Sequence, residues 1–394
     1  MIKKKIVIAT GGTGGHVFPA YSLANYLKNK NFSVKLTSDK RGSIYLKEYN
    51  NLNIVKIPSS PLNKKNIFKL FYSFFIISLS IFKSLLILII DRPLLILGMG
   101  GYSSFPICFA AFILRIKFII YENNLIIGKS NRYLLPFAKK IFVSYKELEG
   151  ISEEYQNKVY EIGNILREEI INLKLELEKK KQFESLKILV LGGSQAAKIF
   201  ADELPPVFKK LNSSKITIKV YQQCQKEQNE QISQFYKKAQ IDYELFNFTD
   251  KIIDYYFKAN LVITRSGASV LGELINIKIP FIAVPLATSA DNHQYKNAVF
   301  YKKKGYGYLL NEKDIKNISG LVIHENFGGT PGDWITIATP TQLPPSVRQN
   351  FDKRVGVPGL EAKDASTTLE QILDHPKLYQ EYPELKGYRV ERYM

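Results

Sequence analysis

Short apolar runs alternate along the chain with stretches whose apolar residues recur every three or four positions. The runs, rich in Ile, Leu and Val, are typical of buried parallel strands, and the spacing of Ala20, Leu23, Ala24 and Leu27 is typical of a helix. Strands are predicted at 6–9, 32–38, 54–57, 94–97, 117–121 and 141–144, and again at 187–191, 216–221, 261–264 and 281–284. The pattern predicts two doubly wound α/β domains.

Glycines interrupt this alternation after the first predicted strand. The sequence GGTGGH at 11–16 must turn the chain before a helix that Pro19 helps to start. The unpaired amides and the dipole of a helix N-terminus favour a bound phosphate or diphosphate. A second glycine turn, GMGGYSS at 98–104, follows a later strand. A dinucleotide-binding loop with Asp39 on a ribose is the alternative, but its third glycine position holds Val17.

Polar residues that suit proton transfer lie next to these turns. His16 lies on the first turn, where an imidazole that titrates near neutral pH can act on a ligand; a purely structural histidine is the alternative. Glu122, Asn123 and Asn124 follow a predicted strand, and the carboxyl ends of parallel strands line the ligand crevice. We therefore expect these side chains to share a cleft with His16, with Asn131 on the next helix.

Residues 63–91 form the most apolar stretch, close in length to the roughly 20 residues of a transmembrane helix. Lys83 and the serines at 73, 78, 80 and 84 interrupt it, and it lies within the strand–helix alternation. We predict a helix with one face in the core and another, apolar and flanked by lysines, that rests on a membrane. A wholly buried core helix is the alternative.

Charge and composition limit the function classes. The formal net charge is +19, and residues 319–394 hold eight Lys or Arg against ten Asp or Glu, so the basic surplus belongs to residues 1–318. This surplus suits an anionic membrane or nucleic acid, although a lysine-rich genome explains it equally well. Two cysteines and four histidines without ligand spacing argue against disulfides and a zinc site, and fit a reducing cytoplasm. The first apolar run is too short for a signal peptide.

Six motifs, taken together and in order, resemble the MurG glycosyltransferases of bacterial cell-wall synthesis. They are GGTGGHVFPA at 11–20, GMGGYSSFP at 98–106, YENN at 121–124, GGSQ at 192–195, TRSGAS at 264–269 with Glu273, and DNHQYKNA at 291–298. That family transfers GlcNAc from UDP-GlcNAc to lipid I, an undecaprenyl-diphosphate-linked muramyl-pentapeptide, and forms lipid II. The resemblance implies a GT-B fold, with two Rossmann-like domains facing across a cleft. Residues 1–162 would form the acceptor and membrane domain, and 163–318 the UDP-GlcNAc domain.

The resemblance also implies roles for single residues. The acceptor, with its diphosphate between the two glycine loops, would contact Thr13, Gly14, Gly15, Gly100, Gly101, Tyr102, Asn124 and Asn131. UDP-GlcNAc would contact Asn124, Arg167, Ser194, Gln195, Phe248, Ile252, Arg265, Ser266, Gly267, Glu273, Gln294 and Asn297. Within this set, Phe248 and Ile252 would border the uracil, Glu273 the ribose, and Gln294 and Asn297 the GlcNAc hydroxyls. Lys64, Lys65, Lys69, Phe74, Phe75, Phe82, Lys139 and Lys140 would contact the membrane.

The implied chemistry is an inverting transfer. It requires a base near the muramyl 4-hydroxyl and groups that stabilise the leaving UDP. His16 is the favoured base, and Glu122 either orients it or replaces it. Helix N-termini, Ser194 and Arg265 can take the leaving-group charge, so neither a metal nor a cofactor is expected. The expected partners are UDP-GlcNAc, lipid I, the anionic cytoplasmic face of the bacterial inner membrane and other cell-wall synthesis proteins, but not nucleic acid; the protein would be peripheral.

Several positions depart from the family pattern. Tyr121 replaces its usual His, Ala201 replaces a frequent Asn, and the hinge reads GNILR at 163–167 instead of GNPVR. Ala196 replaces a glycine of GGSQGA, and its Cβ would hinder close approach to a phosphate.

Residues 319–394 do not resemble the closing helices of the family. Seven of the 17 prolines and the single tryptophan, Trp334, lie there. The role of this atypical segment stays open, as does a fused or chimeric origin. Two other functions also stay open: a GT-B transferase for another lipid or aglycone acceptor, and an inactive membrane-associated binding protein.

Overall fold

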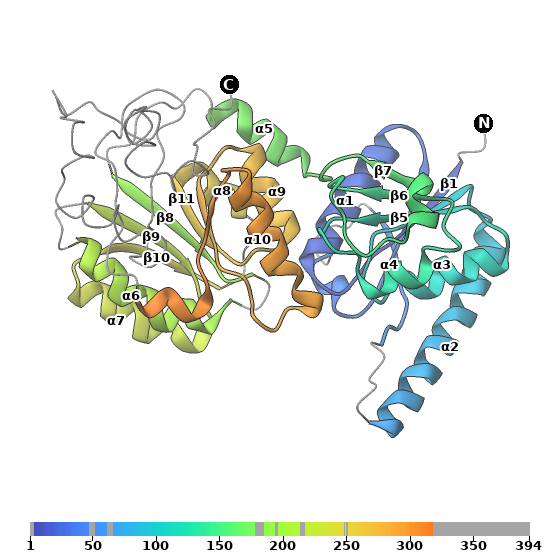
Figure 1. Cartoon of the computed structure of the whole chain (residues 1–394), viewed down its shortest axis with the longest axis horizontal. Coiled ribbons are helices and arrows are strands. Elements are labelled where there is room, and N and C mark those ends of the chain that lie inside the picture. The colour runs from blue at the N-terminus through green and yellow to red at the C-terminus, as the bar shows by residue number, and fades with distance from the viewer. Residues whose placement is uncertain are drawn as a thin grey trace. The chain divides into compact units, whose positions relative to one another are not determined.

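The computed structural model describes residues 4–46, 52–60, 66–177, 185–193, 196–212, 217–247, 249 and 251–317. These residues divide into two compact units (Figure 1). The first unit contains the described residues up to Asn172 together with Gly267–Asn276 and Thr288–Asn297, and the second contains the others. The predicted segment 319–394 lies outside the described residues.

The first unit is built on a parallel sheet of seven strands in the order β3-β2-β1-β4-β5-β6-β7. The strands are β1 Lys5–Ala9, β2 Ser33–Ser38, β3 Asn53–Lys56, β4 Leu95–Gly98, β5 Phe118–Glu122, β6 Lys140–Val143 and β7 Val159–Glu161. The helices are α1 Gly14–Asn29, α2 Ile67–Asp91, α3 Ser104–Ile113 and α4 Lys129–Leu134, with short 3-10 helices at Gly42–Ile44 and Glu153–Lys158. α5 Glu168–Leu177 belongs to this unit up to Asn172 and to the second unit from Leu173. α9, Ala268–Asn276, also belongs to this unit.

The alternating side chains of β1 explain why this strand is apolar from Ile6 to Ala9. Val7 packs into one core cluster with Leu88 of α2, whereas Ile6 and Ile8 pack into a second cluster with Val17 of α1. Successive side chains of a strand point to opposite faces of the sheet, so a strand covered on both faces must be apolar at every position. The two clusters hold the carboxyl end of β1, and therefore the first glycine loop, in a fixed place.

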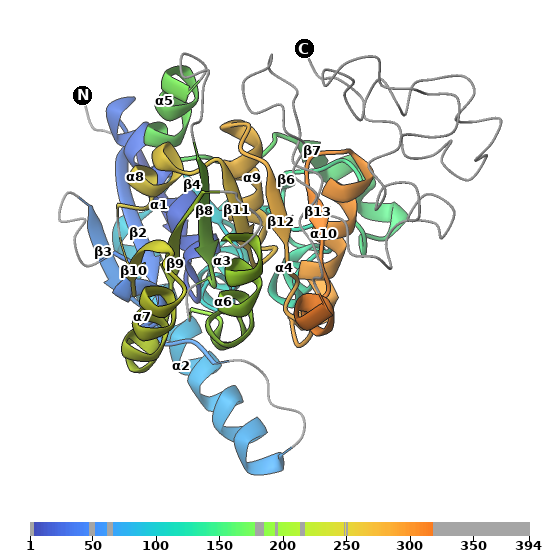
Figure 2. The same cartoon turned by 90° about the vertical axis from the view of Figure 1, so that its left-hand side faces the viewer.

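The second unit contains a parallel sheet of six strands in the order β10-β9-β8-β11-β12-β13. The strands are β8 Leu186–Leu191, β9 Ile218–Gln223, β10 Asp242–Phe246, β11 Leu261–Thr264, β12 Phe281–Ala283 and β13 Tyr308–Leu309. The helices are α6 Lys198–Asn212, α7 Asn229–Lys238 and α8 Ile252–Lys258, with 3-10 helices at Lys226–Gln228 and Glu312–Asn317. The 3-10 helix Ala290–Asn292 and the start of α10 His293–Lys303, up to Asn297, belong to the first unit, and the rest of α10 belongs to the second. α6 and α7 lie side by side on this sheet (Figure 2), where Phe208 and Tyr236 are fully buried.

The fold class predicted from the sequence is confirmed, since both sheets are parallel and covered by helices. Every predicted strand is present within two residues of its predicted bounds, whereas β7, β10, β13, α5, α7 and α8 were not predicted. The first glycine turn is also shorter than expected, because α1 begins at Gly14 with Thr13 as its N-cap residue. The division of the domains near residue 162 stays a prediction.

The interpretation of residues 63–91 as a wholly buried core helix is wrong. The buried side chains of α2 are Ser73, Ser80, Ser84 and Leu88, while its large apolar side chains are mostly exposed. Within the first unit, α2 extends away from the sheet at its N-terminal end (Figure 1). Among the described helices it alone has the length and composition to cross a membrane.

Candidate functional site

The first glycine loop is held by a buried carboxylate. Oδ1 of Asp39 accepts hydrogen bonds from Gly12 N (3.0 Å) and Gly42 N (2.7 Å), and Oδ2 accepts one from Ser59 Oγ (2.8 Å). A Cβ on Gly11 would lie 2.1 Å from Ser103 Oγ, so only glycine fits there. Both carboxylate oxygens of Asp39 are therefore used to hold the loop. This leaves the dinucleotide-binding interpretation without its ribose-binding acid.

The two predicted glycine loops meet at His16. A Cβ built on Gly100 would lie 2.9 Å from Cε1 and 3.0 Å from Nδ1 of His16, and one on Gly101 would lie 3.6 Å from Cδ2. The loops are joined by Met99 N, which donates to Ala9 O (2.8 Å), and by Ser103 Oγ, which donates to Thr10 O (2.7 Å). The imidazole thus lies against the bare backbone of the second loop.

The environment of His16 favours the neutral imidazole. Desolvation in this partly buried position lowers the pKa of His16, and the nearby His293 lowers it further. The negative charge of Glu122 and a hydrogen bond to the backbone of Met99 act in the opposite direction, but desolvation is the larger effect. An imidazole that is neutral near pH 7 and held by the backbone is suited to accept a proton.

Glu122 has four hydrogen-bond donors around its carboxylate. Oε1 accepts from Asn124 N (3.1 Å) and Asn124 Nδ2 (2.9 Å), and Oε2 accepts from Gly128 N (2.9 Å) and Asn131 Nδ2 (3.0 Å). The side chain is buried at the end of β5. Such a carboxylate is already satisfied as an acceptor, so it shapes the loop after β5 and contributes charge near His16.

The other predicted acceptor residues of the first unit surround this centre. Asn131 is buried, donates to Tyr121 O (3.0 Å), and its Nδ2 lies 3.7 Å from the Cβ position of Gly100. Its Oδ1 is buried and has no hydrogen-bond partner among the described residues. Gly14 and Gly15 form the first turn of α1, whereas Thr13 and Tyr102 are exposed. Backbone groups of the glycine loops and the side-chain amide of Asn131 therefore surround His16.

Tyr121, which stands where the family usually has His, is a hydrogen-bonding residue of the hinge. Its hydroxyl lies 2.8 Å from Ser144 Oγ, accepts from Ile165 N (3.2 Å) and donates to Gly163 O (3.3 Å). Burial raises the pKa of Tyr121 to about 12, so the phenol stays protonated at physiological pH.

Two predicted donor residues of the first unit bind each other. Arg167 approaches Oε1 of Glu273 with Nε (3.1 Å) and a terminal guanidinium nitrogen (2.9 Å), and its guanidinium lies over the ring of Phe18. Asn297 is fully buried, accepts from Leu125 N (3.2 Å) and donates to Asn124 Oδ1 (3.3 Å). The sequence did not predict the Arg167–Glu273 pair, which joins two residues expected to contact different parts of the nucleotide. Gln294 lies in the first turns of α10.

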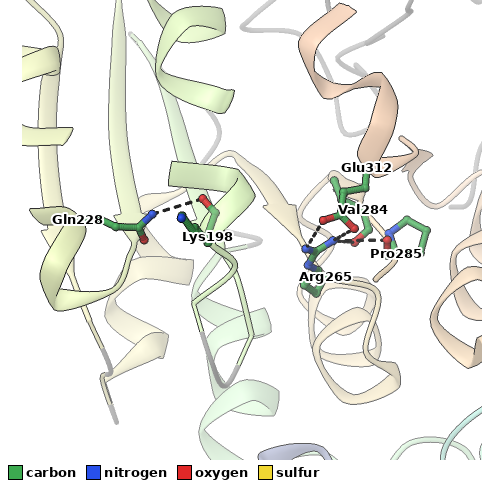
Figure 3. A network of polar contacts seen from close by, with 6 residues as sticks. All are labelled: Lys198, Gln228, Arg265, Val284, Pro285 and Glu312. Carbon is green, nitrogen blue, oxygen red and sulfur yellow. Dashed lines mark hydrogen bonds and ion pairs between the residues drawn. The ribbon is translucent and has the colours of Figure 1, made fainter. Parts of the chain in front are cut away.

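In the second unit the predicted phosphate ligand Arg265 is held by protein groups. Its two terminal nitrogens form a bidentate pair with Glu312 at 3.2 and 3.1 Å, and one also donates to the carbonyls of Val284 and Pro285 (Figure 3). Ser266 is buried, Gly267 precedes α9, and Ile252 begins α8. Ser194, Gln195 and Phe248 lie outside the described residues.

The turn before α6 shows why its glycines matter. A Cβ on Gly192 would lie 1.9 Å from Ala197 N, and Gly192 N donates to Gln223 Oε1 (3.0 Å). Ala196 has φ = +45°, a left-handed conformation that costs an alanine roughly 1–2 kcal/mol and a glycine almost nothing. The departure at Ala196 therefore introduces backbone strain in addition to the expected Cβ.

The predicted membrane contacts Phe74, Phe75 and Phe82 lie on the apolar face of α2. We use this name for its exposed large side chains: Ile67, Phe68, Phe71, Tyr72, Phe74, Phe75, Leu79, Phe82, Leu86, Ile89 and Ile90. Lys69 is exposed on the same helix, and Lys139 is exposed before β6. Lys140 instead places its ammonium 4.1 Å from the ring centroid of Tyr160. Lys64 and Lys65 lie outside the described residues.

Three further residues position groups of the candidate site, a role that the sequence did not predict for any of them. Asn123 Nδ2 donates to Gly15 O (2.9 Å), Asp39 holds the first loop, and Glu312 holds Arg265. Asn123 was grouped with its neighbours at the strand end, but its contact to α1 depends on the packing of the sheet. No group of three or more His, Cys, Asp or Glu side chains that could hold a metal occurs in the described part of the chain.

Two family models match the chain: the glycosyltransferase family 28 N-terminal domain over residues 6–143 and the glycosyltransferase family 28 C-terminal domain over residues 187–323. With the two parallel sheets, these matches define a glycosyltransferase of GT-B fold. A UDP-GlcNAc 2-epimerase from Neisseria meningitidis has the same fold, with a TM-score of 0.51 at 14% identity over 79% of this chain and 89% of the epimerase.

Proteins with higher sequence identity to this chain show which group of GT-B glycosyltransferases it belongs to. The Pelagibacter ubique UDP-N-acetylglucosamine–N-acetylmuramyl-(pentapeptide) pyrophosphoryl-undecaprenol N-acetylglucosamine transferase is 37% identical over 315 residues, 80% of this chain and 86% of the relative. The transferase of the same name from Rickettsia bellii is 35% identical over 317 residues, 80% of this chain and 88% of the relative. A crystal structure of Acinetobacter baumannii MurG is 25% identical, with a TM-score of 0.62 over 79% of this chain and 86% of that one. The chain belongs to the MurG family.

Proposed function

We propose that this protein transfers GlcNAc from UDP-GlcNAc to the muramyl 4-hydroxyl of lipid I and so forms lipid II for peptidoglycan. The family membership supports this activity, because the relatives that match four fifths of the chain are named for it. The structural observation with most weight is the position of His16, which lies between two glycine loops and beside a fully hydrogen-bonded Glu122.

His16 acts as the general base in this proposal. Its imidazole is held by the backbone of Met99 through one ring nitrogen, which leaves the other for the acceptor hydroxyl. The imidazole takes the proton as the hydroxyl oxygen bonds to the anomeric carbon and the bond from that carbon to UDP breaks. Glu122 keeps its loop in place and stabilises the imidazolium that forms. The glycine loops, Asn124 and Asn131 bind the acceptor.

Protein groups bind the donor and stabilise the leaving diphosphate. In the first unit Arg167, Gly267, Glu273, Gln294 and Asn297 contact UDP-GlcNAc, and in the second unit Arg265 and the start of α6 do so. Glu312 holds the guanidinium of Arg265 in a fixed plane (Figure 3). Arg265 is therefore already oriented before the donor binds. A helix N-terminus after a glycine turn supplies further positive potential for a phosphate.

In this proposal the apolar face of α2 rests on the cytoplasmic surface of the inner membrane. Exposed apolar patches larger than a few hundred Å² are rare on soluble monomers and mark interaction surfaces. The neighbouring Phe112, Ile113 and Phe137 are also exposed, and the ring centroids of Phe112 and Phe137 lie 4.3 Å apart. With Lys69 and Lys139 near it, this surface suits an anionic bilayer, where the lipid-linked acceptor is found.

The activity is tested with the full chain, radiolabelled UDP-GlcNAc, a lipid I analogue and a chelator. We expect label in the lipid product from the wild-type chain and a loss of at least 100-fold in His16→Gln, the range for removal of a general base. A second version, with residues 319–394 replaced by the closing segment of the Pelagibacter relative, separates effects of that segment. If neither version transfers GlcNAc to lipid I, the proposal is wrong; transfer to another lipid or aglycone, or vesicle binding without transfer, would favour the two alternatives.

A further inference from the structure

The carbonyl of Gly15 lacks its normal partner within α1. In an α-helix each carbonyl accepts a hydrogen bond from the amide four residues later. For Gly15 that residue is Pro19, which lies inside α1 and has no N–H. A proline ring in a helix interior also crowds the carbonyl four residues earlier. A buried carbonyl without a donor is costly, so another group must replace the missing amide.

Two side chains supply the missing hydrogen bonds. Nδ2 of Asn123 donates to Gly15 O at 2.9 Å, and Oγ of Ser269 donates to the same oxygen at 2.8 Å. Asn123 is buried, and its own Oδ1 accepts from Asn124 Nδ2 (3.0 Å), which fixes its amide with the N–H groups toward Gly15. The two lone pairs of the carbonyl are therefore both used.

The Gly15 carbonyl determines where His16 lies. Gly15 C=O and His16 N belong to the same planar peptide group, so a fixed carbonyl fixes the start of the His16 backbone. His16 N also donates to Thr13 O (3.1 Å). The imidazole in turn has little freedom, because the backbone of Gly100 lies against it. The chain Asn123, Gly15, His16 thus connects the loop after β5 to the candidate base.

We propose that Asn123 is a positioning residue for His16, which replaces the helical N–H that Pro19 cannot supply. This inference rests on the proposed role of His16 as the base. Asn123 itself would not contact the substrates. Pro19 and Asn123 form a matched pair in this arrangement, since Pro19 removes a hydrogen bond to Gly15 O that Asn123 restores together with Ser269.

A double-mutant cycle tests the pairing. Asn123→Ala should lower kcat about tenfold, the effect of one lost hydrogen bond next to the base, with KM for UDP-GlcNAc unchanged. Pro19→Ala restores an N–H at position 19 and should leave kcat near that of the wild type. The double variant should recover most of the lost rate, because the helix then supplies the donor. Asn123→Asp, which keeps the shape but cannot donate from its carboxylate, serves if Asn123→Ala does not fold.

A second readout does not depend on turnover. The chain has four histidines, so the His16 resonance in a histidine-labelled NMR spectrum can be assigned by its loss in His16→Gln. It should shift and broaden in Asn123→Ala and return in the double variant. If the wild type transfers no GlcNAc, the proposed function fails while this spectrum still tests the positioning. If Pro19→Ala rescues neither kcat nor the resonance, Asn123 does not act through Gly15 and the inference is wrong.

Discussion

Gly100 and Gly305 provide a matched test of the contact between the second glycine loop and His16. Both have positive φ, +87° and +76°, so alanine meets similar backbone strain at either position. At Gly305 a new Cβ has nothing within 4 Å, whereas at Gly100 it lies 2.9 Å from the imidazole of His16. The difference between Gly100→Ala and Gly305→Ala therefore isolates the displacement of the ring.

The structure gives the size of both effects. An alanine in the left-handed conformation destabilises the folded state by about 1–2 kcal/mol. Alanine also lowers the conformational entropy of the unfolded chain, which stabilises the protein by about 0.4–1 kcal/mol. Each variant should therefore lose roughly 1 kcal/mol of stability. Contacts of a Cβ become ordinary only beyond 3.4 Å, so in Gly100→Ala the imidazole must retreat by about half an ångström. Since a misplacement of about 1 Å can cost on the order of 100-fold in rate, we expect about a tenfold lower kcat.

The assay combines thermal unfolding with steady-state transfer to a lipid I analogue. Both variants should unfold about 2–4 °C below the wild type, the shift that roughly 1 kcal/mol produces in a domain of this size. Only Gly100→Ala should lose kcat. Equal values of kcat for the two variants would refute the claim that the second loop holds the base in place.

Three further predictions concern the membrane, the pH dependence and the donor turn. The double variant Phe68→Ser, Phe75→Ser removes two rings that are 81% and 64% exposed. It should bind anionic vesicles at least tenfold more weakly, since a buried Phe contributes about 1.5–3 kcal/mol. The control variant Tyr26→Ser, on α1, should bind as the wild type does. Because desolvation lowers the pKa of His16, the rate should fall with decreasing pH only below about pH 6.5, where the base becomes protonated; a pH–rate profile with its midpoint above that value would contradict this. Ala196→Gly should raise stability by roughly 0.5–1 kcal/mol, because relief of the left-handed strain exceeds the cost in unfolded-chain entropy; urea unfolding measures it, and a lower midpoint would show that the strain estimate is wrong.

The strands could be predicted because the physics that forms them is local. A strand buried on both faces must be apolar throughout, so runs such as Ile6–Ala9 and Leu261–Thr264 are visible in the sequence. The missed elements lie where that signal is weak. β7 is three residues long with Tyr160 and Glu161 exposed, and β10 is at the edge of its sheet, so neither has a continuous apolar run.

The candidate site was predictable as a set of positions but not as a set of contacts. From the glycine loops and strand ends we expected His16 and Glu122 at one edge of the sheet, and the structure joins their loops through the hydrogen bond from Asn123 Nδ2 to Gly15 O (2.9 Å). The partners of Arg167 and Arg265 could not be foreseen, because Glu273 and Glu312 lie 106 and 47 residues away in the sequence. Such pairs form only when the chain packs into its tertiary structure, and the local sequence pattern does not show which distant residues meet.

The two faces of α2 decide how this helix can meet a bilayer. Its buried positions are three serines and Leu88, and two of the serine hydroxyls bond to other segments of the first unit. Ser80 Oγ donates to Pro58 O (2.8 Å), and Ser73 Oγ accepts from Ser60 Oγ (3.1 Å). At its C-terminal end, Asp91 forms ion pairs with Lys5 and Lys35 of the sheet. A helix that crossed the bilayer would have to break these contacts and expose the charged end. A helix that lies in the membrane surface keeps them and buries only the apolar face, so the packing of α2 favours peripheral attachment over insertion.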